Sequence, residues 1–224
     1  MHGELVVVDD VPGEFAERVI EAFHSRPHDS FSFAVSGGDT ARRSYQRLAD
    51  DAGSQIDWWK VDVYWGDERC VPLDDPASNY HLVREALLER VGAVNANYPM
   101  RCDDGPDPYQ LRLGELGRID VVHLGLGPDG HTASLFPGSP ALDADPGRLV
   151  VMNHDPSGNN PHPRMTLTFA GIQRARLVLV TVSGEEKREA LARVAAGDEK
   201  VPASRVRADR VLWIADPAAA ADLA

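Results

Sequence analysis

Short apolar runs alternate with amphipathic helical patterns along the chain, and this alternation restricts the fold more than any other feature. The runs are typical of strands that are buried on both faces. They are Phe31–Val35, Val61–Trp65, Ile119–Leu126, Leu149–Met152, Leu177–Val182 and Val211–Ile214. In Arg164–Phe169, apolar positions alternate with threonines, which indicates a strand with one wetter face.

Helical patterns lie between these runs. Phe15, Val19 and Phe23 share one helix face, for example, and so do Ala190 and Val194. Strands that alternate with helices predict an α/β fold, in which a mainly parallel, Rossmann-like sheet is covered by helices on both faces. We expect a single domain over residues 1–224, with surface loops at Arg101–Pro108 and Asn153–Pro163. Ligands of such sheets bind beyond the C-terminal ends of the strands.

The charge balance excludes several classes of partner. The 224 residues include 23 basic and 35 acidic side chains, a formal net charge of −12. Nucleic acids and anionic membranes would repel such a chain, and an anionic substrate would need local cations. There is no apolar run of membrane-spanning length and no export signal, so we expect a cytoplasmic protein without an obligate protein partner. Cys70 and Cys102 are too few for a disulfide framework and fit a reducing compartment, with Cys70 as a small packed side chain.

The first predicted strand with an unusual end is Phe31–Val35, which runs into Ser36-Gly37-Gly38-Asp39-Thr40 and a helix over Thr40–Ala49. Two glycines let the backbone approach a ligand, and the helix N-terminus favours an anion. The hydroxyls of Ser36 and Thr40 would complete a phosphate cradle. The alternative is a tight turn with Asp39 or Thr40 as the N-cap, and the Asp39 carboxylate opposes phosphate unless it points away.

The second unusual end follows Val61–Trp65, where Asp67, Glu68 and Arg69 crowd together. The Arg69 guanidinium suits a phosphate or carboxylate, and the two neighbouring acids could hold it in place. A solvated loop with a local ion pair is the alternative. Farther on, Ser78 or Asn79 is expected to cap a helix over Leu82–Val91.

The third unusual end spans residues 125–137 and contains G-x-G-x-x-G. Because Pro128 interrupts that motif and no acid ends a second strand at a suitable distance, we do not predict a dinucleotide cofactor. His131, at the start of a short helical stretch, has Asp129 two residues before it, which suits a general base. His154, Asp155 and His162 lack ligand spacing, so no metal is predicted. The other histidines, His123 included, are interpreted as structural.

Taken together, these motifs resemble the 6-phosphogluconolactonases. The resemblance rests on Ser-Gly-Gly-x-Thr, on Trp-Gly-Asp-Glu-Arg-x-Val-Pro with Ser-Asn-Tyr downstream, and on Gly-Leu-Gly-Pro-Asp-Gly-His-Thr-Ala-Ser-Leu-Phe-Pro. Arg164-Met-Thr-Leu-Thr and the stretch from Val182 to Lys187 extend it. One departure is Asp39-Thr40-Ala41, where the family commonly has Ser-Thr-Pro. The related glucosamine-6-phosphate deaminases share the fold but differ after the histidine.

The resemblance implies a sugar-phosphate isomerase/deaminase-like fold and a hydrolase that opens 6-phospho-D-glucono-1,5-lactone in the pentose phosphate pathway. By resemblance, His131 deprotonates water and Asp129 orients its ring, without metal or other cofactor. The implied substrate-binding residues are Ser36, Gly37, Gly38, Thr40, Asp67, Arg69, Lys187 and Arg164. Two alternatives stay open: a deaminase or isomerase of the same fold, and a non-catalytic sugar-phosphate sensor, which would normally carry a DNA-binding segment.

Overall fold

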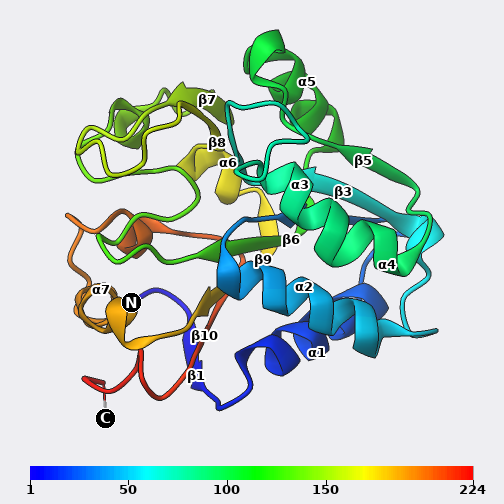
Figure 1. The fold of residues 1–224 in the computed structure, drawn as a ribbon, viewed down its shortest axis with the longest axis horizontal. Helices are drawn as coiled ribbons and strands as arrows, with labels where there is room; N and C mark the ends of the chain where they lie inside the picture. Colours follow the sequence, from blue (N-terminus) through cyan, green and yellow to red (C-terminus); the bar gives the residue numbers. More distant parts are fainter. Residues whose placement is uncertain (224) are drawn as a thin grey trace.

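The computed structural model describes residues 1–223. Within them, seven strands form one parallel sheet in the order β1-β10-β9-β6-β2-β3-β5 (Figure 1). Their bounds are β1 Glu4–Val7, β2 Phe31–Val35, β3 Val61–Trp65, β5 Ala96–Tyr98, β6 Ile119–Gly125, β9 Ala175–Val182 and β10 Arg210–Ala215. The mainly parallel sheet predicted from the apolar runs is confirmed, and the short edge strands β1 and β5 are additions to it.

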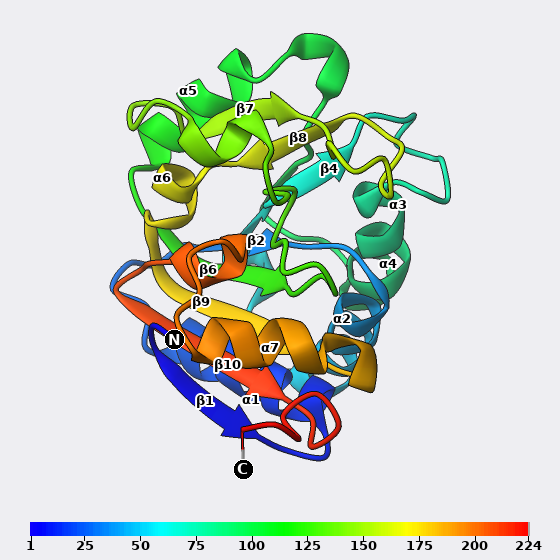
Figure 2. The ribbon, with the colours of Figure 1, turned by 90° about the vertical axis from the view of Figure 1, so that its left-hand side faces the viewer.

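A second, antiparallel sheet of three strands in residues 1–223 lies beside the first, in the order β4-β8-β7 (Figure 2). Its strands are β4 Asp67–Arg69, β7 Val150–Asn153 and β8 Arg164–Leu167. The sequence prediction was wrong on two points here. Leu149–Met152 was assigned to strands buried on both faces, yet Met152 in β7 is exposed. The wetter face expected for Arg164–Phe169 is absent from β8, since all four of its residues are buried between β4 and β7.

Helices cover both faces of the parallel sheet. α1 and α2 pack side by side on one face, and α7 crosses the other (Figure 2). The helices are α1 Val11–His24, α2 Asp39–Ala52, α3 Asn79–Val83, α4 Glu89–Val91, α5 Asp107–Leu116, α6 Phe169–Ile172 and α7 Arg188–Ala195, with a π-helical turn over Arg84–Leu88. α5 begins inside the predicted loop Arg101–Pro108. Across residues 1–223, no helix is long and apolar enough to cross a membrane.

The core fixes how the α1–α2 face meets the sheet. The rings of Phe15 on α1 and Tyr45 on α2 both contact Phe33 of β2, with centroids 6.4 and 6.3 Å away. All three side chains are buried, and burying each aromatic side chain contributes about 1.5–3 kcal/mol. This packing orients the α2 N-terminus toward the C-terminal end of β2.

Cys70 and Cys102 form a disulfide, with Cα atoms 5.4 Å apart. The expectation of two reduced thiols is therefore corrected. The bond joins the residue after β4 to a 3₁₀ turn over Cys102–Asp104. The sequence spacing of 32 residues carried no sign of this contact, because it depends on how two loops are brought together by β3 and β5.

Candidate active site

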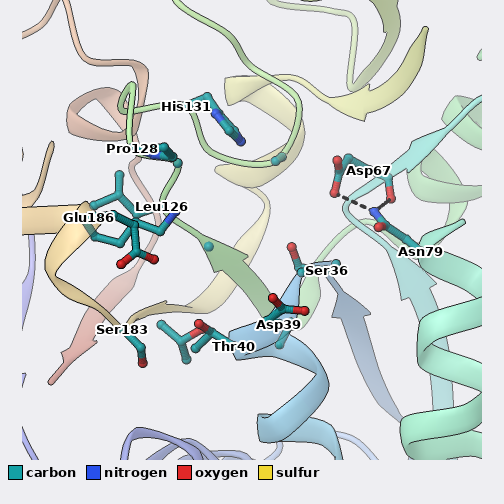
Figure 3. Close-up of a pocket in the computed structure, with 18 of the residues that line it drawn as sticks. Ser36, Asp39, Thr40, Asp67, Asn79, Leu126, Pro128, His131, Ser183 and Glu186 are labelled. Atoms are coloured by element: carbon teal, nitrogen blue, oxygen red, sulfur yellow. Dashed lines mark hydrogen bonds between the residues drawn. The ribbon is translucent and has the colours of Figure 1, made fainter. Parts of the chain in front are cut away.

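A cavity of about 240 Å³ lies at the C-terminal ends of β2, β6 and β9, which lie near one another in the sheet (Figure 3). Its lining comes from segments far apart in the sequence. The lining residues are Ser36, Gly37, Gly38, Asp39, Thr40, Ala41, Asp67, Arg69, Asn79, Gly125, Leu126, Gly127, Pro128, His131, Ala133, Thr181, Ser183, Glu186 and Lys187. The three unusual strand ends therefore meet at one place.

The first strand end supplies the α2 N-terminus. Helix α2 begins at Asp39 with Gly38 as its N-cap, so the alternative caps Asp39 and Thr40 are both corrected. Gly37 lets the backbone after β2 approach the Asn79 side chain closely, because a Cβ at Gly37 would lie only 1.9 Å from Asn79 Oδ1. The helix is long enough to present unpaired N–H groups and a positive dipole end to an anion in the cavity.

The second strand end holds a buried carboxylate at the cavity wall. Asp67 accepts a hydrogen bond from Ser134 Oγ at 2.6 Å. It accepts another from Asn79 Nδ2 at 3.2 Å (Figure 3). The neighbouring Glu68 accepts from the backbone N–H groups of Asn79 and Tyr80, both at 2.7 Å. Burial raises the pKa of Glu68, and these backbone N–H groups oppose that rise. Both acids therefore organise the start of α3, which Ser78 caps as one of the two predicted alternatives.

Arg69 is not held by the two acids, contrary to the sequence-based expectation. Its guanidinium donates from Nη1 to the carbonyl of Ala77 at 2.6 Å. Among residues 1–223, neither Arg69 nor Lys187 forms an ion pair, whereas ten of the 20 arginines do. Two cations without an ion pair therefore line the cavity, together with the acids Asp39, Asp67 and Glu186.

The third strand end places a histidine against an aspartate. His131 Nδ1 lies 2.6 Å from Asp129 Oδ1, which also accepts the His131 backbone N–H at 3.0 Å. Gly127 makes room for the ring, because a Cβ there would lie 2.1 Å from His131 Nδ1. The prediction of a short helix that starts at His131 is wrong, because no helix begins there. Ala133 adopts φ 47°, in the left-handed region, and an isolated bridge joins Thr132 to Leu135 instead.

The interactions between Asp129 and His131 favour a charged Asp129, which can orient the His131 ring. Burial is the largest influence on Asp129 and opposes its ionisation, but the hydrogen bonds and charge interaction with His131 together leave the pKa of Asp129 lowered. A charged Asp129 accepts the proton on His131 Nδ1, which leaves Nε2 without a proton in the neutral ring. The ring lines the cavity, whereas Asp129 is not among the lining residues.

Two predicted site residues, Asp129 and Arg164, are outside the cavity lining. Arg164 is only 5% exposed and lies opposite Arg69 in the register of the antiparallel strands β4 and β8. Its Cζ atom lies 5.9 Å from the centroid of the Phe136 ring. Burial lowers the pKa of its guanidinium, and the charge of Asp67 opposes this. The lining also includes Asn79, Thr181, Ser183 and Glu186, which the sequence patterns did not predict. Ser183 and Glu186 could have been found, because Ser183 directly follows β9 and Glu186 lies in the next turn, at the active edge of the sheet.

Within residues 1–223, no group of three or more His, Cys, Asp or Glu side chains is arranged to hold a metal ion. The cavity instead offers hydroxyls, a helix N-terminus, two cations and a carboxylate-bound imidazole. An α/β fold with these groups at its C-terminal strand edge is typical of an enzyme that acts on a small phosphorylated substrate by acid–base chemistry.

The chain belongs to the glucosamine-6-phosphate isomerase/6-phosphogluconolactonase family, whose model matches residues 6–213. A 6-phosphogluconolactonase of Mycobacterium tuberculosis is 39% identical over 209 residues, covering 84% of this chain and 83% of the relative. One of Nostoc sp. is 38% identical over 211 residues, covering 86% and 85%. Among solved structures, the 6-phosphogluconolactonase of Thermotoga maritima matches with a TM-score of 0.82 at 27% identity, over 95% of this chain and 99% of that one.

Proposed function

We propose that this protein hydrolyses 6-phospho-D-glucono-1,5-lactone to 6-phosphogluconate, with His131 as the general base. The observation that carries the proposal is the 2.6 Å contact between His131 Nδ1 and Asp129, on a ring that lines a cavity with two unpaired cations. The named relatives support the substrate class. The hydrolase activity belongs to the oxidative branch of the pentose phosphate pathway.

The proposed reaction needs only a base and a positioned ester. His131 Nε2 takes a proton from water while the water oxygen bonds to the lactone carbonyl carbon, and the carbonyl electrons move onto its oxygen. The tetrahedral intermediate then collapses, the bond to the ring oxygen breaks, and the protonated His131 returns its proton to that leaving oxygen. Asp129 is a positioning residue, since it fixes the tautomer and orientation of the ring. A δ-lactone is already an activated ester, so we propose no metal and no other cofactor.

The phosphate would bind where hydrogen-bond donors converge. Helix α2 supplies N–H groups next to Gly37 and Gly38, and the hydroxyls of Ser36 and Thr40 line the same wall. Arg69 and Lys187 add positive charge, and direct contact of Arg164 with the anion finds no support in its position. The buried Asp67 carboxylate would repel phosphate and is better suited to accept a hydroxyl of the sugar.

The binding partners and the cellular location are proposed from the net charge of the protein. A net charge of −12 supports a partner set limited to the small-molecule substrate, without nucleic acid or membrane surface. A cytoplasmic location is proposed on the same basis. The Cys70–Cys102 disulfide would be open to reduction by protein dithiols in such a compartment.

The decisive experiment follows acid release from freshly prepared lactone in a pH-stat, with the spontaneous rate subtracted. We expect rapid catalysis by the wild type and a large loss in His131→Asn. Glucosamine 6-phosphate with an ammonia-coupled readout is the matched control, and catalysed release of ammonia would favour the deaminase alternative. No acceleration of lactone opening would refute the proposal.

A further inference from the structure

A chain of buried polar side chains runs beneath the cavity from Ser36 to Thr181. The Ser36 backbone N–H donates to the Tyr45 hydroxyl at 2.6 Å, which lies 2.7 Å from His123 Nδ1. His123 Nε2 lies 2.9 Å from Thr181 Oγ1. Tyr45 and His123 are fully buried, yet Ser36 and Thr181, the two ends of the chain, line the cavity.

The direction of the hydrogen bonds follows from the number of protons available. Burial lowers the pKa of His123 to about 3 and raises the pKa of Tyr45, so both groups are neutral and each has one proton to donate. The Tyr45 hydroxyl lies 3.3 Å from the Ser36 carbonyl but only 2.7 Å from His123 Nδ1. The shorter contact takes the Tyr45 proton, because a hydroxyl bond of 2.7 Å is close to ideal and one of 3.3 Å is weak.

His123 must then carry its own proton on Nε2 and donate it to Thr181 Oγ1. Thr181 accepts that bond, so its hydroxyl proton has no acceptor within the chain of side chains. Among the hydrogen bonds of residues 1–223, the His123 contact is the one that the Thr181 hydroxyl makes. The residue borders the cavity, and a ligand oxygen there is the available acceptor.

We propose that Thr181 is a further substrate-binding residue, whose hydroxyl donates to the phosphate of the bound substrate and is aimed by Tyr45 and His123. The phosphate end is indicated because the His123 ring packs on Phe15 of α1, with centroids 4.3 Å apart, and bonds to Tyr45 of α2. These contacts place Thr181 on the sheet face where α2 begins. The substrate in this inference rests on the proposed function, but the donor direction does not.

The same row of hydrogen bonds determines which group of Ser36 can bind the phosphate. Its backbone N–H is used by Tyr45, so the phosphate would meet the Ser36 hydroxyl and not its amide. The Thr181 hydroxyl of β9 would add a donor to those of Ser36 and Thr40, and would replace the Ser36 backbone N–H that Tyr45 occupies. Donors matter here because Asp39 and Glu186 also line the cavity and repel a dianion.

The first test compares Thr181→Val, which removes the hydroxyl but keeps the shape, with Thr181→Ser, which keeps the hydroxyl. The measurements are the Kd of 6-phosphogluconate and of inorganic phosphate, with kcat, KM and Tm. Since a hydrogen bond to a charged group contributes about 1.5–3 kcal/mol, Thr181→Val should weaken both Kd values and raise KM by about 10- to 150-fold. Thr181→Ser should stay within about threefold of wild type. Equal losses in both variants, or none in Thr181→Val, would overturn the proposal.

The second test addresses the aiming of the hydroxyl. The ¹⁵N shifts of the His123 ring should show the proton on Nε2, and a proton on Nδ1 would overturn the donor direction. Tyr45→Phe should weaken phosphate binding in the wild-type background and have a smaller effect in Thr181→Val. Additive effects would overturn the aiming of Thr181, because Tyr45 would then act through Ser36 alone. Neither readout uses lactone turnover, so a wild type without lactonase activity would refute the proposed function and leave this inference standing.

Discussion

The carboxylate of Asp129 binds both the ring and the backbone of His131. Oδ1 lies 2.6 Å from Nδ1 and accepts the backbone N–H at 3.0 Å. One oxygen thus fixes the side chain and the main chain of the same residue, so the ring cannot rotate freely between its two faces. Gly127 is required for this geometry, because the Cβ of any other residue would overlap with His131 Nδ1.

Replacing His131 with Asn should remove proton abstraction and leave the phosphate site intact. General-base catalysis contributes about 10²–10⁴-fold, so kcat should fall by that factor while the Kd of 6-phosphogluconate changes little. Asp129→Asn should give a smaller loss, because it disturbs the orientation of the base without removing it. A folded His131→Asn enzyme that keeps more than about a tenth of kcat would exclude His131 as the base.

Gly127→Ala tests the close approach to the ring. Its new Cβ would lie 2.1 Å from His131 Nδ1 and 2.7 Å from Asp129 Oδ1, so the pair must separate or shift. Because misplacement of about 1 Å can cost 10²-fold in rate, we expect kcat to fall at least that far with phosphate affinity retained.

The matched control is Gly114→Ala in α5, where a Cβ meets no atom within 4 Å. This variant should keep full activity and gain up to about 1 kcal/mol of stability, the usual helix preference of alanine over glycine. Activity assays and thermal unfolding of both variants decide the matter. Normal turnover by Gly127→Ala would show that the ring position is not critical.

Arg69→Ala should weaken substrate binding more than folding. Its guanidinium faces the cavity without an ion pair and has one hydrogen bond, to the Ala77 carbonyl. Loss of a charge-assisted contact to phosphate should raise KM by about 10-fold or more. Arg69→Lys keeps the charge and should recover part of the loss. An unchanged KM with a collapse of Tm would make Arg69 a structural residue.

The sequence was most informative where local pattern and burial agree. β2 and β3 have the predicted bounds because central parallel strands are apolar on both faces and end where polar residues begin. The same logic located the ends of β2, β3 and β6, and with them Ser36, Arg69 and His131. These three residues do line one cavity, although nothing in their spacing fixes the distances between them.

The missed features depend on long-range pairing. β4 consists of two acidic residues and an arginine, and it becomes a strand only because β8 lies beside it. The burial of Arg164 follows from that pairing, which no local sequence pattern shows. In the sequence, Thr181 is simply one residue of an apolar strand. Its connection to Tyr45 depends on two hydrogen bonds of the buried His123 ring, which only the structure shows.

Reduction of the Cys70–Cys102 disulfide should lower stability. Crosslinks that close loops of about 15–100 residues stabilise by roughly 3–4.7 kcal/mol in the chain-entropy description. The sequence separation here is 32 residues, so dithiothreitol should lower the unfolding free energy by an amount within that range. KM should rise as well, because Cys70 directly follows Arg69. Cys102→Ser is the control and should respond to neither oxidant nor reductant; a wild type equally insensitive to dithiothreitol would contradict the prediction.

Stability should fall in weak acid because of His123. Burial lowers its folded-state pKa from 6.5 to about 3, so above pH 6.5 the ring is neutral in both states and contributes nothing. Between these values the unfolded chain binds a proton that the folded protein excludes, and the unfolding free energy falls as pH falls, by up to about 1.4 kcal/mol per pH unit. Urea unfolding from pH 6.5 to 5 should therefore show a shallower slope in His123→Asn than in wild type. Asp155, whose pKa is lowered from 3.8 to about 2, titrates below this window and does not interfere. Parallel slopes for the two proteins would mean that His123 takes up its proton in the folded state, and its neutral ring could then no longer be the element that directs the Thr181 hydroxyl.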